Sequence, residues 1–226
     1  THPFNKDCAT FAKSGIPFYV CPGTSAWVTL TGKTKNMSAN LLNAARNATK
    51  HGAQGYLLTD WGDRGHHQTL PISYPGIFMA GCLSWDISKN KNTDWATAMD
   101  THLFRNPQAK LGKWLLDFGH VYEHISQPVF NSSFFHHQFF TKAYDTSKLT
   151  DIPASEMKRC LRDFATLKEQ LKQVKPKCAD AALLKDELAF SLYMATTGAE
   201  RGLALSQGKD YQSTPLKNKI RRCAAL

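Results

Sequence analysis

The chain has 226 residues, enough for one large domain or two small ones, and its 42% hydrophobic and 20% charged residues exclude a disordered protein. Its net charge of +10 is dispersed, without the basic clusters of a nucleic-acid-binding protein, although an anionic partner or an acidic glycan is compatible with it. No apolar run approaches the roughly 20 residues of a membrane-spanning helix, so we expect no membrane partner.

Residues 1–93 predict alternating helices and strands after an irregular or helical start. Apolar runs bounded by turn residues predict strands at residues 16–21, 55–59 and 77–83. A helix capped by Ser38 and ended by Gly52 joins the first two strands. Two prolines and a glycine make residues 70–76 a loop. This order is the βαβ pattern of a parallel sheet, but the strands are too few to complete one. We expect the N-terminal part of this domain either to be missing from the chain or to be supplied by another chain.

Residues 94–226 predict a helical domain because glycines become rare and apolar residues recur at helical spacing. The expected helices begin near Asp94, Leu111, Phe134, Asp151 and Ala179. The last of them is expected to bury Leu183, Leu184, Leu188, Leu192 and Ala195. The predicted fold class is therefore α/β followed by all-α, with domains at residues 1–93 and 94–226.

Cysteines and glycosylation motifs indicate the compartment. The six cysteines form no Cys-x-x-Cys pair, which argues against a zinc site. Glycosylation motifs begin at Asn36, Asn47 and Asn131. Together with the even cysteine count they favour a secreted or lysosomal glycoprotein with disulfide bonds. Because the chain begins at Thr1, we expect a processed piece of a longer protein.

Three tryptophans each follow a predicted strand and form the main functional signal. They are Trp27, Trp61 and Trp85. Any one of them alone is explained by core packing, but at the carboxyl ends of parallel strands indole rings offer flat surfaces for sugar rings. The neighbouring carboxylates can accept hydrogen bonds from sugar hydroxyls, and they are Asp60, Asp63 and Asp86. The set predicts a carbohydrate site.

Two other interpretations of the polar residues are weaker. Asp60 and Asp63 with His66 could bind a metal ion, but a metal site needs a more complete set of ligands, so we expect none. The adjacent Asp186 and Glu187 lie in the middle of a predicted helix on a solvated face, and we reject them as a catalytic pair.

A resemblance to a known family gives this pattern a more specific meaning. The segments that carry it are Cys21–Trp27, Leu58–His66 and Ser73–Trp85, with the string Thr-Asp-Trp-Gly-Asp-Arg-Gly-His at their centre. They resemble the C-terminal half of the barrel in glycoside hydrolase family 20, the β-N-acetylhexosaminidases, in the branch with a helical domain after the barrel. The resemblance implies a portion of a (β/α)8 TIM barrel, about strands six to eight.

The family's chemistry is retaining and substrate-assisted: the 2-acetamido carbonyl attacks the anomeric carbon, and an adjacent Asp–Glu pair orients the substrate and transfers the proton. No such pair lies between Thr1 and Asp86. The resemblance therefore implies no catalytic residue in this chain and a partner that carries the acid. It implies substrate-binding roles for Asp60, Trp61, Trp85, Asp86 and Trp27, with lesser roles for Asp63 and His66.

We therefore expect the C-terminal chain of an exo-β-N-acetylhexosaminidase, inactive alone and needing no cofactor. Its expected partners are the N-terminal chain of the same enzyme and a glycan that contains N-acetylhexosamine. A homodimer through the helical domain is left open. The alternative is a non-catalytic carbohydrate-binding or interaction module derived from such an enzyme.

Overall fold

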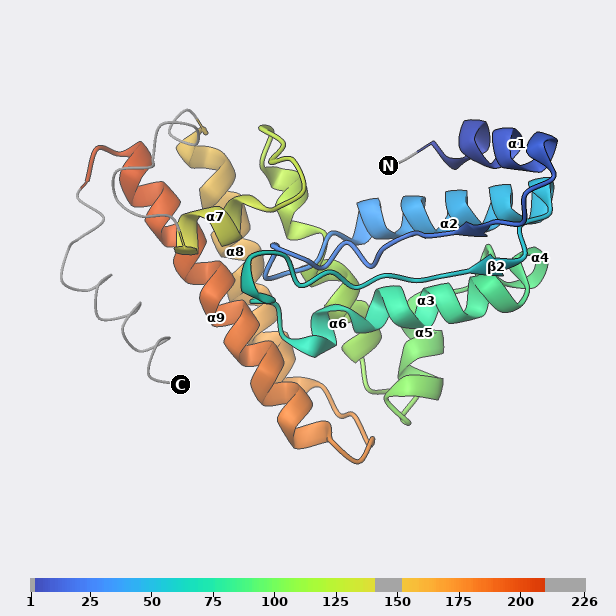
Figure 1. Cartoon of the computed structure of the whole chain (residues 1–226). Helices are drawn as coiled ribbons and strands as arrows, with labels where there is room; N and C mark the ends of the chain where they lie inside the picture. The colour runs from blue at the N-terminus through green and yellow to red at the C-terminus, as the bar shows by residue number, and fades with distance from the viewer. Residues whose placement is uncertain (1–2, 141–151, 210–226) are drawn as a thin grey trace.

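The computed structural model describes residues 3–140 and 152–209, which are mostly helical (Figure 1). The α-helices are α1 (Phe4–Ser14), α2 (Thr34–His51), α3 (Tyr74–Trp85), α4 (Ile87–Asn90), α5 (Trp95–Ala98), α6 (Leu111–Phe118), α7 (Phe134–Phe140), α8 (Ala154–Gln173) and α9 (Ala181–Ser206). Short 3-10 or π turns lie at η1 (Asp63–Gly65), η2 (Leu70–Ile72), η3 (Met99–Leu103) and η4 (Val121–His124). The strands found in these ranges are β1 (Tyr19–Val20) and β2 (Gly55–Tyr56).

The predicted third strand is wrong, because residues 77–83 lie within α3. Pro75 stands in the first turn of α3, where a missing N–H does no harm, and Met79, Ala80 and Leu83 are buried at helical spacing. An apolar run of this kind fits a buried strand or a buried helix equally well. The expected loop at residues 70–76 is also wrong, since it contains η2 and the start of α3.

The strands form one parallel pair, so the expected portion of a TIM barrel with strands six to eight is wrong for this chain. Tyr19 pairs with Gly55 and Val20 with Tyr56 in a β1–α2–β2 unit. The crossover helix ends as predicted at Gly52, whose φ of 69° is left-handed, but it begins at Thr34 and not near Ser38.

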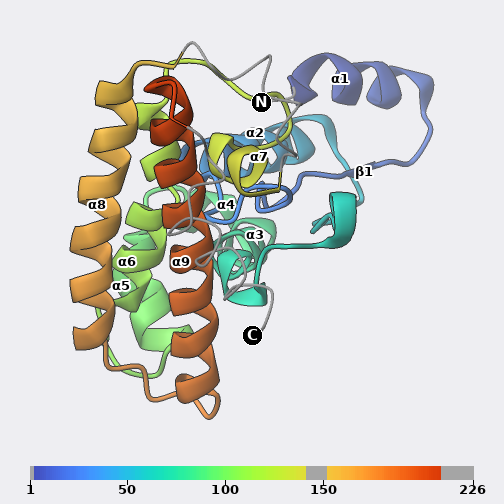
Figure 2. The same cartoon turned by 90° about the vertical axis from the view of Figure 1, so that its left-hand side faces the viewer.

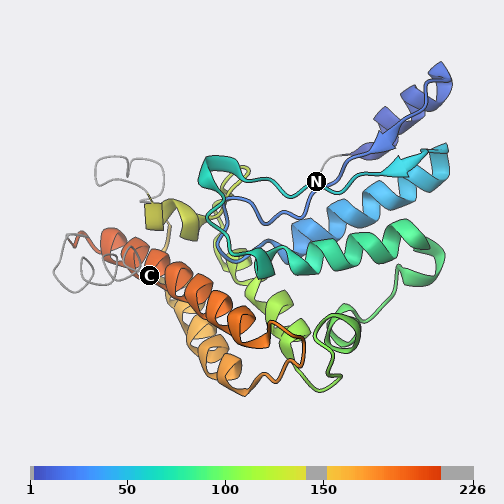
Figure 3. The same ribbon diagram turned by 60° about the horizontal axis from the view of Figure 1, so that its bottom comes forward.

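One face of the parallel pair of strands is covered by helices, whereas the opposite face is exposed to solvent. On one face Val20 and Tyr56 pack against residues of α1, α2 and α3, and Figure 3 shows α2 and α3 lying side by side. The opposite face carries Tyr19 and Leu57, which are 62% and 55% exposed. Parallel sheets in proteins are almost always covered on both faces. The uncovered apolar face is therefore a feature that calls for an explanation.

The helical part of the chain is close to its prediction. The long helices α8 and α9 run side by side (Figure 2), and α6 packs against α8 through Trp114 and Phe118. The buried side chains of α9 include four that were predicted, Leu184, Leu188, Leu192 and Ala195. The prediction that Leu183 is buried is wrong, because this side chain is exposed. The predicted start at Asp151 and the cysteine Cys223 lie outside the described residues.

The largest core joins the two predicted domains. Ala26, Leu30 and Ile72 from the first part belong to the same buried cluster as the side chains of α6 to α9. The division between residues 93 and 94 stays a prediction. The cysteines of the described ranges, including Cys160 and Cys178, are free thiols. Within residues 3–140 and 152–209, no helix is long and apolar enough to cross a membrane.

Asp100 caps α6 from a distance in sequence, and this gives a first stability prediction. Its buried Oδ1 accepts hydrogen bonds from the backbone N–H groups of Leu111, at 3.0 Å, and Gly112, at 2.8 Å. Asp100→Ala leaves both donors buried without a partner, so we expect the free energy of unfolding to fall by about 2 kcal/mol in urea denaturation. Asp100→Asn keeps the accepting oxygen and should recover most of that loss. Equal losses in the two variants would contradict this role.

Candidate functional site

The carboxyl ends of β1 and β2 bring Thr24 and Asp60 together, as expected of parallel strands. The strands stay paired beyond their named residues, since Thr24 N–H donates to Thr59 O at 3.0 Å. The Thr24 hydroxyl then donates to Asp60 Oδ1 at 2.5 Å, and the Ser73 hydroxyl donates to Asp60 Oδ2 at 2.8 Å. Gly76 of α3 packs against Thr24, where a Cβ would lie 3.0 Å from the Thr24 Cα. The carboxylate is held from both sides.

Asp60 retains capacity for a ligand. A carboxylate offers about four lone-pair positions, and the two hydroxyls occupy two of them. His66 Nε2 lies 3.8 Å from Oδ2 with its side chain 43% exposed, and the Asp60 side chain is 21% exposed. The site therefore has an oriented acceptor at the surface beside an accessible imidazole. Asp63 is half-buried at the start of η1, and no hydrogen bond joins its carboxylate to Asp60.

The loop after Asp60 presents Trp61 to solvent. Trp61 is 54% exposed, and its carbonyl accepts a hydrogen bond from the buried Gln68 amide at 3.0 Å. Three consecutive residues then have left-handed φ angles: Arg64 at 59°, Gly65 at 109° and His66 at 55°. Such angles are unfavourable for Arg and His by about 1 kcal/mol each, and residues of this kind gather at functional sites.

A pocket of about 720 Å³ opens beside Trp27, just past the end of β1. Its lining residues are Ser25, Trp27, Thr29, Lys33, Asn36, Asn40, Pro128, Val129, Phe130, Asn131 and Ser132. The indole Nε1 of Trp27 donates to Asn131 Oδ1 at 2.8 Å, and the indole ring covers Gly23, where a Cβ would lie 2.7 Å from the ring. The structure thus places Trp27 near Asp60, with Gly23 and Thr24 between them.

The sequence analysis missed Lys33 and Asn40 in this pocket. Together with Asn36 they follow each other at three- and four-residue spacing at the start of α2, so they line one face of the helix. The sequence contains this spacing, but the predicted helix begins near Ser38, so Lys33 and Asn36 lie before its first turn and the shared face is not recognised. The Asn36 amide Nδ2 donates to Ser25 Oγ at 2.8 Å, and Asn40 Oδ1 accepts from Gly23 N–H at 3.1 Å.

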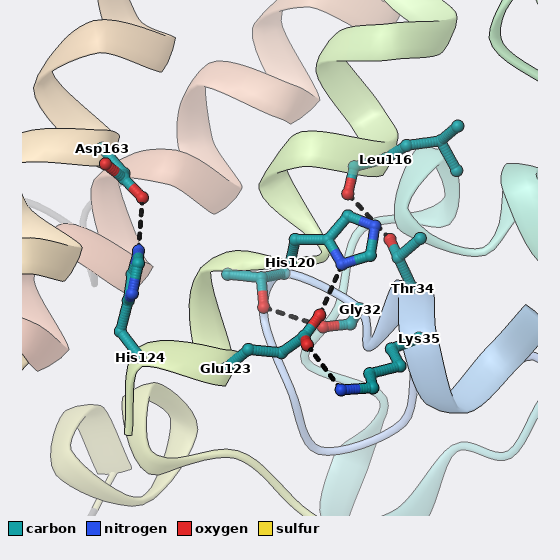
Figure 4. A network of polar contacts seen from close by, with 9 residues as sticks. Gly32, Thr34, Lys35, Leu116, His120, Glu123, His124 and Asp163 are labelled. Carbon is teal, nitrogen blue, oxygen red and sulfur yellow. Dashed lines mark hydrogen bonds and ion pairs between the residues drawn. The ribbon is translucent and has the colours of Figure 1, made fainter. Parts of the chain in front are cut away.

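A polar network anchors the first turn of α2 and so fixes these side chains (Figure 4). The Thr34 hydroxyl donates to Leu116 O at 2.9 Å, and Thr34 N–H donates to Gly119 O at 2.8 Å. The Glu123 carboxylate lies between two basic groups: its Oε1 is 2.5 Å from His120 Nδ1, and its Oε2 is 3.1 Å from Lys35 Nζ. Such exposed ion pairs contribute at most about 1 kcal/mol each, so the buried Thr34 contacts are the main restraint.

The structure does not bring Trp85 and Asp86 to this edge. Trp85 is the last residue of α3 and Asp86 follows it, whereas Ser73 precedes the first turn. A helix of this length spans roughly 18 Å. Trp85 is 90% exposed. Asp86 caps α4 by accepting hydrogen bonds from the Ser88 hydroxyl and from Lys89 N–H, and these bonds lower its pKa. The two residues belong to a different part of the surface.

The glycosylation motifs fall in two places. Asn36 and Asn131 line the pocket beside Trp27, and the Asn36 Nδ2 that would carry a glycan is already bonded to Ser25. Asn47 lies on α2, where its Nδ2 donates to Asn43. Glycosylation of all three stays a prediction.

His67 and the buried His136 connect the Trp61 loop to α7. His67 Nδ1 lies 3.0 Å from His136 Nε2, and the His67 ring stacks on Phe140 with centroids 3.9 Å apart. Burial lowers the pKa of His136 to about 3, with His67, His137 and the Arg64 guanidinium acting in the same direction. Burial also lowers the pKa of His67. Neutral rings are thus favoured where the loop meets the helix.

Across the described part of the chain, no group of three or more His, Cys, Asp or Glu side chains is arranged to hold a metal ion. Comparisons of the chain with protein-family models, with curated proteins and with solved structures gave no match.

Proposed function

We propose that this chain supplies a sugar-binding wall to a retaining, substrate-assisted β-N-acetylhexosaminidase whose Asp–Glu pair lies on a separate N-terminal chain. The observation that carries the proposal is the carboxylate of Asp60, held by Thr24 and Ser73 between the exposed Trp61 and the pocket beside Trp27. An oriented acceptor between aromatic surfaces is the usual composition of a carbohydrate site. The resemblance of the Thr-Asp-Trp-Gly-Asp-Arg-Gly-His string supports the family.

Each residue has a chemically distinct task in this proposal. Asp60 accepts a hydrogen bond from a sugar hydroxyl, because Thr24 and Ser73 leave part of its carboxylate free. Trp61 and Trp27 provide faces for the pyranose ring. The partner chain supplies the proton donor, while the acetamido group of the substrate acts as nucleophile. This chain thus binds and orients, and it holds the anomeric carbon in place for the attack.

The open face of the parallel pair supports a partner chain. Tyr19 and Leu57 expose apolar surface on the face opposite α2, and a two-stranded parallel pair has edges whose backbone groups can bond to further strands. A second chain that covers this face would bury both side chains. A secreted or lysosomal two-chain enzyme is the form that we propose, and a homodimer through the helical domain stays a prediction.

A pair of tryptophan variants tests the site. We expect N-acetylglucosamine to shift the indole signals of Trp61 and Trp27 in the NMR spectrum of the 226-residue chain, and Trp61→Ala to weaken this binding about tenfold. Trp85→Ala is the matched control, because Trp85 is even more exposed but lies at the far end of α3. The site would be refuted if both variants weakened the binding of N-acetylglucosamine equally, or if neither variant weakened it.

A second experiment separates the enzyme from a non-catalytic sugar-binding module. This alternative is kept because no adjacent Asp–Glu pair lies between Thr1 and Asp86. Native mass spectrometry of the protein purified from its source should show a second chain bound to this one. That assembly should hydrolyse a chromogenic N-acetylglucosaminide, and Asp60→Asn in it should lower the activity. A single chain that binds the sugar without hydrolysing it would establish the module instead.

A further inference from the structure

We propose that the pocket beside Trp27 receives an acidic sugar residue, whose carboxylate or sulfate group contacts Lys33, Asn40 and Asn131. This inference rests on the proposed function and narrows its substrate class to glycans that carry an anionic unit next to the N-acetylhexosamine. Nothing in it requires hydrolysis by this chain. It follows from which hydrogen-bonding atoms of the pocket are already used and which remain for a ligand.

The charge in the pocket has one sign. Its lining contains no carboxylate, and Lys33 is its one ionisable group. The Lys33 ammonium donates to Val129 O at 3.3 Å and lies 5.5 Å from the centroid of the Tyr122 ring. Burial removes water from the ammonium and so lowers the pKa of Lys33. The lining of the pocket contributes no negative charge to balance it. An anionic ligand would supply that charge at a partly dehydrated site, where charge pairing is strongest.

The amide groups of the pocket offer donors. Asn40 uses its Oδ1 to accept from Gly23 N–H, and Asn131 uses its Oδ1 to accept from the Trp27 indole. These contacts fix the amide orientations and, in the chain without a glycan on Asn131, leave both Nδ2 groups without a partner among the described residues. Two amide donors and an ammonium match the oxygen atoms of a carboxylate or a sulfate. Asn36 is oriented the other way, so its Oδ1 remains to accept from a sugar hydroxyl.

The walls and the size of the pocket suit a sugar and not a bare anion. Trp27 contributes its indole, and Val129 and the 96% exposed Phe130 add apolar surface at the mouth. A volume of about 720 Å³ lies within the range of roughly 300–1,000 Å³ in which proteins bind small molecules. An inorganic anion would leave most of this space and the aromatic surface unused.

Titrations of the 226-residue chain test the inference. The ligands are N-acetylglucosamine, N-acetylglucosamine 6-sulfate, glucuronic acid and inorganic sulfate, with binding followed by NMR at the Trp27 indole. We expect at least one acidic sugar to bind about tenfold more tightly than N-acetylglucosamine, and Lys33→Gln to remove that preference. Asn40→Asp, which retains the acceptor for Gly23 N–H and adds a negative charge, should also remove it. Comparing the sulfated sugar with the uronic acid identifies the anionic group.

Lys35→Gln is the matched control, because Lys35 is two residues away, 73% exposed and paired with Glu123 outside the pocket. The preference should survive this change. Equal affinities for acidic and neutral sugars overturn the inference and leave the proposed function standing. Inorganic sulfate that binds as tightly as the sugars shows an anion site without sugar recognition and also overturns it. Acidic sugars that bind while Trp61→Ala leaves N-acetylglucosamine unaffected would instead refute the proposed function.

Discussion

Gly198→Ala should lower the free energy of unfolding by about 3 kcal/mol, the upper end for overpacking a core. Gly198 lies in the middle of α9, where α7 packs across it (Figures 1 and 2). A Cβ at this position would lie 2.4 Å from the backbone carbonyl oxygen of Phe135. Because that oxygen belongs to a buried helix, the two helices must separate. Urea denaturation measures the loss, and the midpoint of thermal unfolding should fall by roughly 6–12 °C.

The control for this variant is another helical glycine with free space around it. Gly81 lies on the exposed side of α3, and a Cβ there meets nothing within 4 Å. Gly81→Ala should therefore stabilise the chain by about 0.5–1 kcal/mol, since alanine favours the helix more than glycine does. Two variants with the same effect, of either sign, would show that α7 and α9 do not meet as described.

Acidification should destabilise the chain through His136. Burial lowers the pKa of His136 to about 3, whereas in the unfolded chain it returns to about 6.5. Below pH 6.5 the unfolded state takes up a proton that the folded state does not, so stability falls by up to about 1.4 kcal/mol for each pH unit. The loss at this site should reach about 3 kcal/mol at pH 4.5, and it should be absent above pH 6.5.

His136→Phe tests this by removing the titrating group while it keeps an aromatic ring beside Phe140. The difference in unfolding free energy between pH 7.5 and pH 4.5 should shrink by about 3 kcal/mol in the variant. The matched control is His102→Gln, a change at an exposed histidine of η3, which should keep the pH dependence of the original chain. A His136→Phe chain that loses as much stability on acidification as the original would contradict the buried neutral pair.

The sequence predicted part of the candidate site correctly and misplaced the rest. The turn after residues 55–59 predicted a polar cluster, and Asp60, Trp61 and Trp27 do lie at the carboxyl edge of a parallel pair. The prediction for Trp85 is wrong because the apolar run before it was interpreted as a strand, whose carboxyl end would lie at the same edge as Asp60. The run instead forms α3, which begins beside Asp60 and ends at Trp85, far from that edge.

The β–α–β order of residues 19–56, the helix end at Gly52 and the helices within residues 94–140 and 152–206 follow from local causes: turn residues, a left-handed terminus and apolar spacing. The sequence by itself determined these features, because each depends on residues a few positions apart. Only the tertiary structure decided that Thr24 and Ser73 hold Asp60, that His67 meets His136, and that Lys33 lies in a pocket without a carboxylate. The contacts of Asp60 and of His67 join residues 13 to 69 positions apart, and Lys33 meets Val129 at a separation of 96 positions. No local preference encodes which distant partner a side chain will meet.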